Sequence, residues 1–139
     1  MLKSEGIAPK IREQFELRDK AMSGDFVFVV TTIDAAPAAA SDGFDAITVR
    51  IEAQNAAGDV QTWFNKTITT TALAVTTTGN GTAAQVPATT CVMTNGVGEV
   101  EVTGSLVWAA DDTFVVETAE ATILGYTIAA DSATVTCVA

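Results

Sequence analysis

Apolar and polar residues alternate at every second position over most of the chain after residue 25, and this pattern predicts β-strands. The clearest case is residues 46–54, where Ile47, Val49 and Ile51 point to one side and Arg50 points to the other. Since strand side chains alternate between two faces, a shift of one residue would turn the whole apolar set to solvent. The pattern therefore predicts burial as well as strand position.

Segments of this kind recur at intervals of roughly 8–12 residues, which is typical of a β-sandwich. The expected strands are residues 25–33, 46–54, 60–64, 67–78, 89–94, 99–108, 113–122 and 133–138. Turn sequences separate several of them, the strongest being Asn95-Gly96, which favours a tight hairpin turn. We expect an all-β fold, an antiparallel β-sandwich of about seven strands.

The alternation also assigns individual side chains to the core or to the surface. We expect these residues to be buried between two sheets: Ile47, Val49, Ile51, Val100, Val102, Val135 and Cys137. We expect these to be exposed: Arg50, Glu52, Glu99 and Glu101. Trp63 and Phe64 are adjacent, so only one of them can face the core, and the other is a candidate contact residue.

The first 24 residues have helical spacing instead. Their apolar stripe consists of Ile7, Ile11, Phe15 and Met22. Pro9 suits a first helical turn and Gly24 a helix end, so an amphipathic helix is predicted over residues 9–23. Short isolated helices are marginal in water. The stripe must therefore be buried, either on the protein's own β-domain or on another subunit. The predicted organisation is an arm, residues 1–24, followed by a β-domain, residues 25–139.

Charge separates the same two parts. Residues 1–24 hold five of the seven basic residues and four acidic ones, a balance of +1. The β-domain holds two basic and thirteen acidic residues, a balance of −11. A pI near 4.1 argues against nucleic acid as a partner, because phosphate binding needs a basic face.

The sequence also limits the chemistry and location that we expect. No apolar run approaches the roughly 20 residues of a membrane-spanning helix, and the N-terminal segment lacks the apolar core of a secretory signal. We therefore expect no membrane partner and no export.

The chain contains no histidine, the commonest general base, and no phosphate-binding glycine loop. We expect no catalytic residues, no cofactor and no metal. The acidic pairs Asp42/Asp45, Asp111/Asp112 and Glu117/Glu120 lie in or beside turns, where Asp serves local hydrogen bonding, and a calcium site at either Asp pair is the weaker alternative.

Two stretches resemble bacterial immunoglobulin-like modules. The first, residues 45–72, is an alternating strand, an Asn-Ala-Ala-Gly-Asp turn and a Thr-rich strand: DAITVRIEAQNAAGDVQTWFNKTITTTA. The second, residues 89–121, is a short strand, an Asn-Gly-Val-Gly turn and an alternating strand: TTCVMTNGVGEVEVTGSLVWAADDTFVVETAEA. With the flanking strands, the resemblance covers residues 26–138 and leaves the arm outside it. Modules of this kind occur in bacterial surface adhesins and in tailed-phage virion proteins.

The resemblance implies an immunoglobulin-like fold and a non-enzymatic structural role. A single copy with its own arm is similar to phage capsid-decoration or cement proteins, which are made in the host cytoplasm and join the virion there. The implied partners are other virion subunits, above all the major capsid protein, in many copies. The candidate partner-binding residues of the arm are Ile7, Ile11, Arg12, Phe15, Arg18 and Met22. The alternative is a bacterial surface or carbohydrate-adhesion module, which needs two exposed aromatic residues on one outer face.

Two cysteines, Cys91 and Cys137, occupy core-type positions next to Met93 and Val135 in the alternation. They are either buried free thiols that act as small apolar residues, or a bridge between strands, since an immunoglobulin-like fold can place such strands opposite each other.

Overall fold

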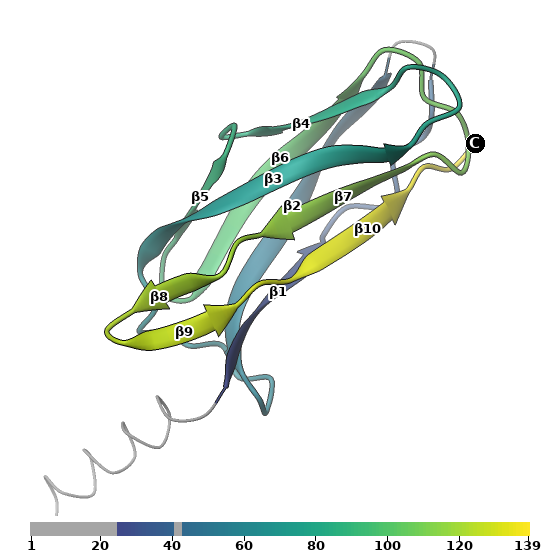
Figure 1. The fold of residues 1–139 in the computed structure, drawn as a ribbon. Helices are drawn as coiled ribbons and strands as arrows, with labels where there is room; N and C mark the ends of the chain where they lie inside the picture. The colour runs from purple at the N-terminus through teal and green to yellow at the C-terminus, as the bar shows by residue number, and fades with distance from the viewer. Residues whose placement is uncertain (1–24, 41–42) are drawn as a thin grey trace, which may run out of the picture.

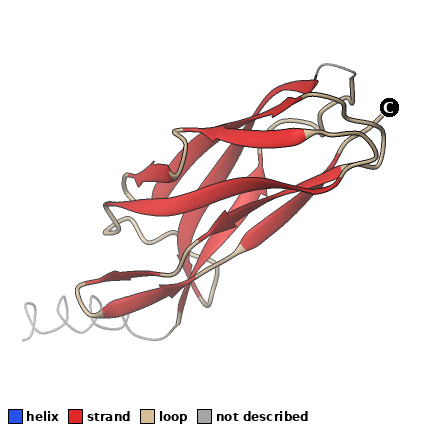
Figure 2. Ribbon diagram, turned by 45° about the horizontal axis from the view of Figure 1, so that its top comes forward, coloured by secondary structure: helices blue, strands red, loops and turns tan. Residues whose placement is uncertain are grey.

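A computed structural model of the protein describes residues 25–40 and 43–139. These residues form ten β-strands and no helix (Figures 1 and 2). The strands are β1 Phe26–Thr32, β2 Gly43–Asn55, β3 Lys66–Thr76, β4 Thr82–Val86, β5 Thr90–Met93, β6 Val97–Ser105, β7 Thr113–Thr118, β8 Ala121–Ile123, β9 Tyr126–Ala129 and β10 Ser132–Thr136. The predicted arm helix over residues 9–23 lies outside the described residues.

The strands form two sheets that pack face to face, as the all-β prediction required. The larger sheet has six strands in the order β4-β6-β2-β1-β9-β8, and the smaller has four in the order β10-β7-β3-β5. Figure 1 shows β3 and β7 lying across β2 and β6. Each sheet thus has one face in the core and one in solvent, which explains the alternating sequence.

Ten strands are present, not about seven, because residues 113–122 divide into β7 and β8 and because β4 and β9 were not predicted. β4 belongs to the larger sheet and β5 to the smaller, with only residues 87–89 between them. β7 and β8, and likewise β9 and β10, divide between the sheets in the same way. Residues 113–122 were predicted as one strand because no glycine or proline interrupts the sequence between β7 and β8.

The register of β2 and β6 confirms the predicted burial. Ile47 pairs with Val102 and Val49 with Val100, and all four side chains are buried. Ile51, Val135 and Cys137 are buried as well. The polar set faces outward as expected: Arg50, Glu99 and Glu101 are exposed, and Glu52 is half-buried.

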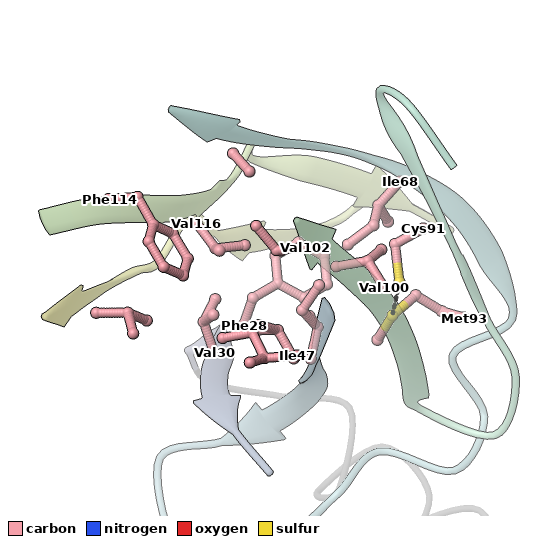
Figure 3. Close-up of a cluster of buried hydrophobic side chains, with 14 of the residues drawn as sticks. Phe28, Val30, Ile47, Ile68, Cys91, Met93, Val100, Val102, Phe114 and Val116 are labelled. Carbon is pink, nitrogen blue, oxygen red and sulfur yellow. Dashed lines mark hydrogen bonds between the residues drawn. The ribbon is translucent and has the colours of Figure 1, made fainter. Parts of the chain in front are cut away.

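Aromatic and β-branched side chains fill the space between the sheets (Figure 3). Phe28 from the larger sheet packs edge-on against Phe64 with ring centres 5.6 Å apart. Phe44 stacks on Phe114 of the smaller sheet at 5.0 Å. Burying one such side chain contributes about 1.5–3 kcal/mol. The Phe44–Phe114 stack joins the two sheets directly, while Phe64 packs into the core from the turn between β2 and β3.

The Asn95-Gly96 turn is present as predicted. Both residues have positive φ, 51° and 81°, and the flanking Thr94 and Val97 exchange backbone hydrogen bonds of 2.9 and 3.1 Å. Asparagine and glycine tolerate this left-handed conformation better than other residues, which is why the dipeptide predicts the turn.

Other expectations were wrong. Residues 60–64 form a turn and no strand, because Phe64 N–H donates to the Gln61 carbonyl at 2.9 Å. Strand β4 was not predicted, since it is rich in alanine, and neither was β9. The sheet is also not purely antiparallel: β1 and β9 run parallel through Phe26 and Val27.

Candidate functional site

The residues predicted to bind a partner lie outside the described part of the chain: Ile7, Ile11, Arg12, Phe15, Arg18 and Met22. Their role stays a prediction. The described chain begins at Asp25, and Phe26 directly after it is buried. The first residues of β1 therefore anchor the point at which the arm joins the β-domain.

An aromatic cluster surrounds this point. The Phe26 ring lies 5.5 Å from that of Trp63 and 5.8 Å from that of Tyr126, both edge-on. Trp63 and Tyr126 are half-buried, while Phe64 is fully buried. The prediction that only one of Trp63 and Phe64 faces the core assumed a strand, but these residues lie in a turn, and Trp63 packs against the edge of the core beside Phe64. Edge-on aromatic pairs contribute about 0.5–1.5 kcal/mol beyond area burial, so the cluster stabilises the end of the domain at which β1 begins.

Local hydrogen bonds hold Trp63 in this cluster. Its indole Nε1–H donates to Gln61 Oε1 at 2.9 Å, and the amide of Gln61 donates to the Asp59 carbonyl at 2.7 Å. The planes of Trp63 and Tyr126 are tilted by 58° with ring centres 6.1 Å apart. The two half-buried rings lie side by side, and their tilt means that they do not form a flat platform.

Most of the strand-borne charge lies on the outer face of the larger sheet. Arg50 on β2 is directly opposite Glu99 on β6, with 3.0 Å between Nη2 and Oε1. Each side chain is almost half exposed, so the pair contributes no more than about 1 kcal/mol. Glu52 and Glu101 lie on the same face, which leaves it with a net negative charge.

Asp112 has a structural role. Its side chain is 1 % exposed. One carboxylate oxygen accepts from Ala109 N–H at 2.8 Å, and the other accepts from Thr78 N–H at 3.0 Å. The bond from Ala109 is the main cause of a lowered pKa for Asp112, with the bonds from Thr78 acting in the same direction and burial opposing them. This carboxylate ties the loop after β3 to the loop before β7.

Asp112 and the other acidic residues near the turns do not form a group of metal ligands in the described part of the chain. Within residues 25–40 and 43–139, no three His, Cys, Asp or Glu side chains form a group that could hold a metal ion. Asp42 lies outside those residues, and Asp45 is exposed. The same part of the chain contains no helix that is long and apolar enough to cross a membrane.

Cys91 and Cys137 are free and buried, as the first of the two alternatives required. Cys91 lies on β5 and Cys137 follows β10, and these strands are opposite edges of the four-stranded sheet. Three strand spacings of about 4.8 Å separate such edges, too far for a disulfide. Burial is the main cause that raises the pKa of both thiols, that of Cys91 to about 11.

Sequence reasoning missed one buried polar contact. Gln85 on β4 donates to Thr70 Oγ1 on β3 at 2.6 Å, and both residues are buried. The alternation of side chains along a strand could have indicated this contact, because Gln85 occupies a position that faces the core. We did not predict the strand on which it lies. It joins the two sheets beside the switch from β4 to β5.

Comparison with known proteins gives no family assignment. No family model matches the chain, and no curated protein matches it. Among solved structures, the chain is similar to a conjugative transposon lipoprotein from Bacteroides eggerthii, with a TM-score of 0.41 and 13% identity. That likeness covers 81% of this chain and 98% of the other.

Proposed function

We propose that this protein is a non-enzymatic structural module with an immunoglobulin-like sandwich, a component of a tailed-phage virion that decorates or cements the capsid through residues 1–24. The partners are other virion subunits, above all the major capsid protein, and the assembly holds many copies. The resemblance of residues 45–72 and 89–121 to immunoglobulin-like modules supports the class of protein.

The observation that carries the docking role is the division of charge. The β-domain has a balance of −11, so like copies and acidic neighbours repel it at close range. Residues 1–24 carry five of the seven basic residues and join the domain at the aromatic cluster of Phe26, Trp63 and Tyr126. A basic, apolar-striped segment at this end is suited to hold an acidic domain on a neighbouring subunit.

The environment of the two thiols supports the non-enzymatic part of the proposal. A cysteine nucleophile reacts as the thiolate, which needs a lowered pKa and access to solvent. Both Cys91 and Cys137 are buried with raised pKa values. Their burial suits packing and not nucleophilic catalysis.

Mass spectrometry tests whether the protein is part of phage particles. The sample is a fractionated culture whose DNA encodes this chain. Arg50 and Lys66 are the sole basic residues after residue 24, so trypsin releases the peptide 51–66 from the β-domain. We expect this peptide in density-gradient fractions of phage particles, in a constant ratio to the major capsid protein. Its recovery in the cell-envelope fraction, with none in particles, would overturn the proposal in favour of a surface or adhesion module.

A further inference from the structure

The outer face of the four-stranded sheet is almost free of charge. Its outward side chains, here called the Thr/Val face, are Thr67, Thr69, Thr71, Leu73 and Val75 of β3, Thr90 and Val92 of β5, Thr113, Val115 and Glu117 of β7, and Ser132, Thr134 and Thr136 of β10. Glu117 is the one charged residue in this set.

This face differs from the charged part of the larger sheet. The outer face of the larger sheet carries Arg50, Glu52, Glu99 and Glu101 on the neighbouring strands β2 and β6. The two central strands of the smaller sheet, β3 and β7, present threonine, valine and leucine, with Glu117 as their one outward charge. A protein with thirteen acidic residues after residue 24 therefore keeps one broad side nearly neutral.

Large apolar side chains lie open on the Thr/Val face. Leu73 is 53% exposed, Val75 is 60% exposed and Val92 is 61% exposed. Leu73 pairs directly with Val115 across β3 and β7, and Val115 pairs with Thr134 of β10. Leu73, Val75 and Val115 thus form a small apolar patch on β3 and β7, and Val92 lies apart from it, opposite Thr67. An exposed apolar patch of this kind is a candidate contact surface.

We propose that the Thr/Val face binds the same face of a second copy of this chain. The distribution of charge favours this arrangement of two copies. The acidic sides of two such domains repel each other, whereas the Thr/Val faces can meet through neutral side chains. A two-fold arrangement places the same patch on both subunits, so a self-complementary neutral face suffices. This inference stands apart from the virion proposal, because it concerns the isolated chain.

The dimensions of the face agree with a weak dimer. β3 has eleven residues, but β5, β7 and β10 have four, six and five. At about 3.4 Å per residue and about 4.8 Å between strands, the face covers roughly 400 Å². Stable interfaces bury about 800 Å² per partner, with weaker ones below that. Faces of branched side chains on two twisted sheets also pack well in the aligned arrangement of β-sandwiches. We therefore expect a dimer of weak affinity.

The test is sedimentation velocity of the full chain between 1 and 500 µM, followed by point variants. We expect a monomer–dimer equilibrium, and Leu73→Glu and Val92→Glu should each raise its Kd at least tenfold. Leu124→Glu is the matched control, since Leu124 is 70% exposed at the β8–β9 hairpin tip, off the face. It should change the Kd less than twofold. Thermal melts confirm that each variant is folded.

Two further measurements distinguish this dimer from one held by residues 1–24. Added salt should lower the Kd, because it screens the repulsion of two acidic chains. Glu117→Gln should tighten the dimer more than Glu101→Gln, which removes the same charge from the opposite face. A monomer at 500 µM would overturn the inference. So would a dimer that Phe15→Ala weakens and Leu73→Glu leaves intact.

Discussion

Gln85 Nε2 lies 2.6 Å from Thr70 Oγ1 in a buried hydrogen bond that joins the two sheets. The same amide donates to the Pro87 carbonyl at 2.8 Å. A backbone carbonyl can only accept, so these partners define which end of the Gln85 amide carries the nitrogen. The contact lies where the chain leaves the larger sheet after β4 and enters the smaller one at β5. It therefore connects the layers and positions the switch between them.

Gln85→Ala should lower the free energy of unfolding by about 1–3 kcal/mol, because it leaves buried acceptors without their donor. Chemical denaturation measures the change. Thr82→Ala, at an exposed position of the same strand, should change stability by less than about 0.5 kcal/mol. Equal effects of the two substitutions would contradict the role assigned to Gln85.

Asp112 should make the protein sensitive to acid. Its pKa is lowered in the folded state, mainly by the hydrogen bond from Ala109 N–H. The stability from this group is thus fully present above the unfolded pKa of about 3.9 and is lost as pH falls through the lower folded pKa.

Asp112→Asn should lower the Tm at pH 7 and flatten its decline in acid, as followed by circular dichroism from pH 2 to 7. Asp111→Asn is the control, because Asp111 is exposed and has a φ of 71° that asparagine also tolerates. If the Tm of Asp112→Asn falls in acid as steeply as that of the unmodified protein, other carboxylates cause the acid sensitivity.

The thiols should be inert in the folded protein. With a pKa of about 11, Cys91 is about one part in a thousand thiolate at pH 8, and burial also blocks reagents. Thiol labelling at pH 8 should therefore follow the rate of unfolding, and both cysteines should react at once in concentrated denaturant.

Removing one thiol should have a small cost in packing. Cys137→Ala should lower the free energy of unfolding by about 1–2 kcal/mol. Reducing agent should leave the Tm unchanged, since both cysteines are free. A large drop in Tm on reduction would mean that the thiols form a bridge in solution.

Deletion of residues 1–24 should leave a folded β-domain that no longer joins its assembly. Phe15→Ala in the full chain should weaken attachment by about 2–3 kcal/mol if Phe15 is a buried anchor. Added salt should weaken attachment as well, because the arm is the basic part of the chain. Incorporation into purified particles, quantified by the 51–66 peptide, measures all three effects. Normal incorporation of the truncated chain, or unfolding of its β-domain, would contradict the docking role.

The sequence alone determined the strands with strong alternation and the direction of their side chains. Ile47, Val49, Val100 and Val102 were placed in the core correctly, because alternation is a local property of the pleated backbone. The Asn95-Gly96 turn was predictable for the same reason: its conformation depends on two residues and not on the rest of the chain.

Only the tertiary structure decided which strands pair and where segments change sheets. Residues 113–122 contain no glycine or proline and were predicted as one strand, yet β7 and β8 belong to different sheets. Gln85 and Asp112 became structural groups because distant segments bring Thr70 and Thr78 to them. The neutral Thr/Val face likewise exists only because β3, β5, β7 and β10 lie side by side. Strand pairing depends on contacts far apart in the chain, and a period of two residues carries no information about the partner strand.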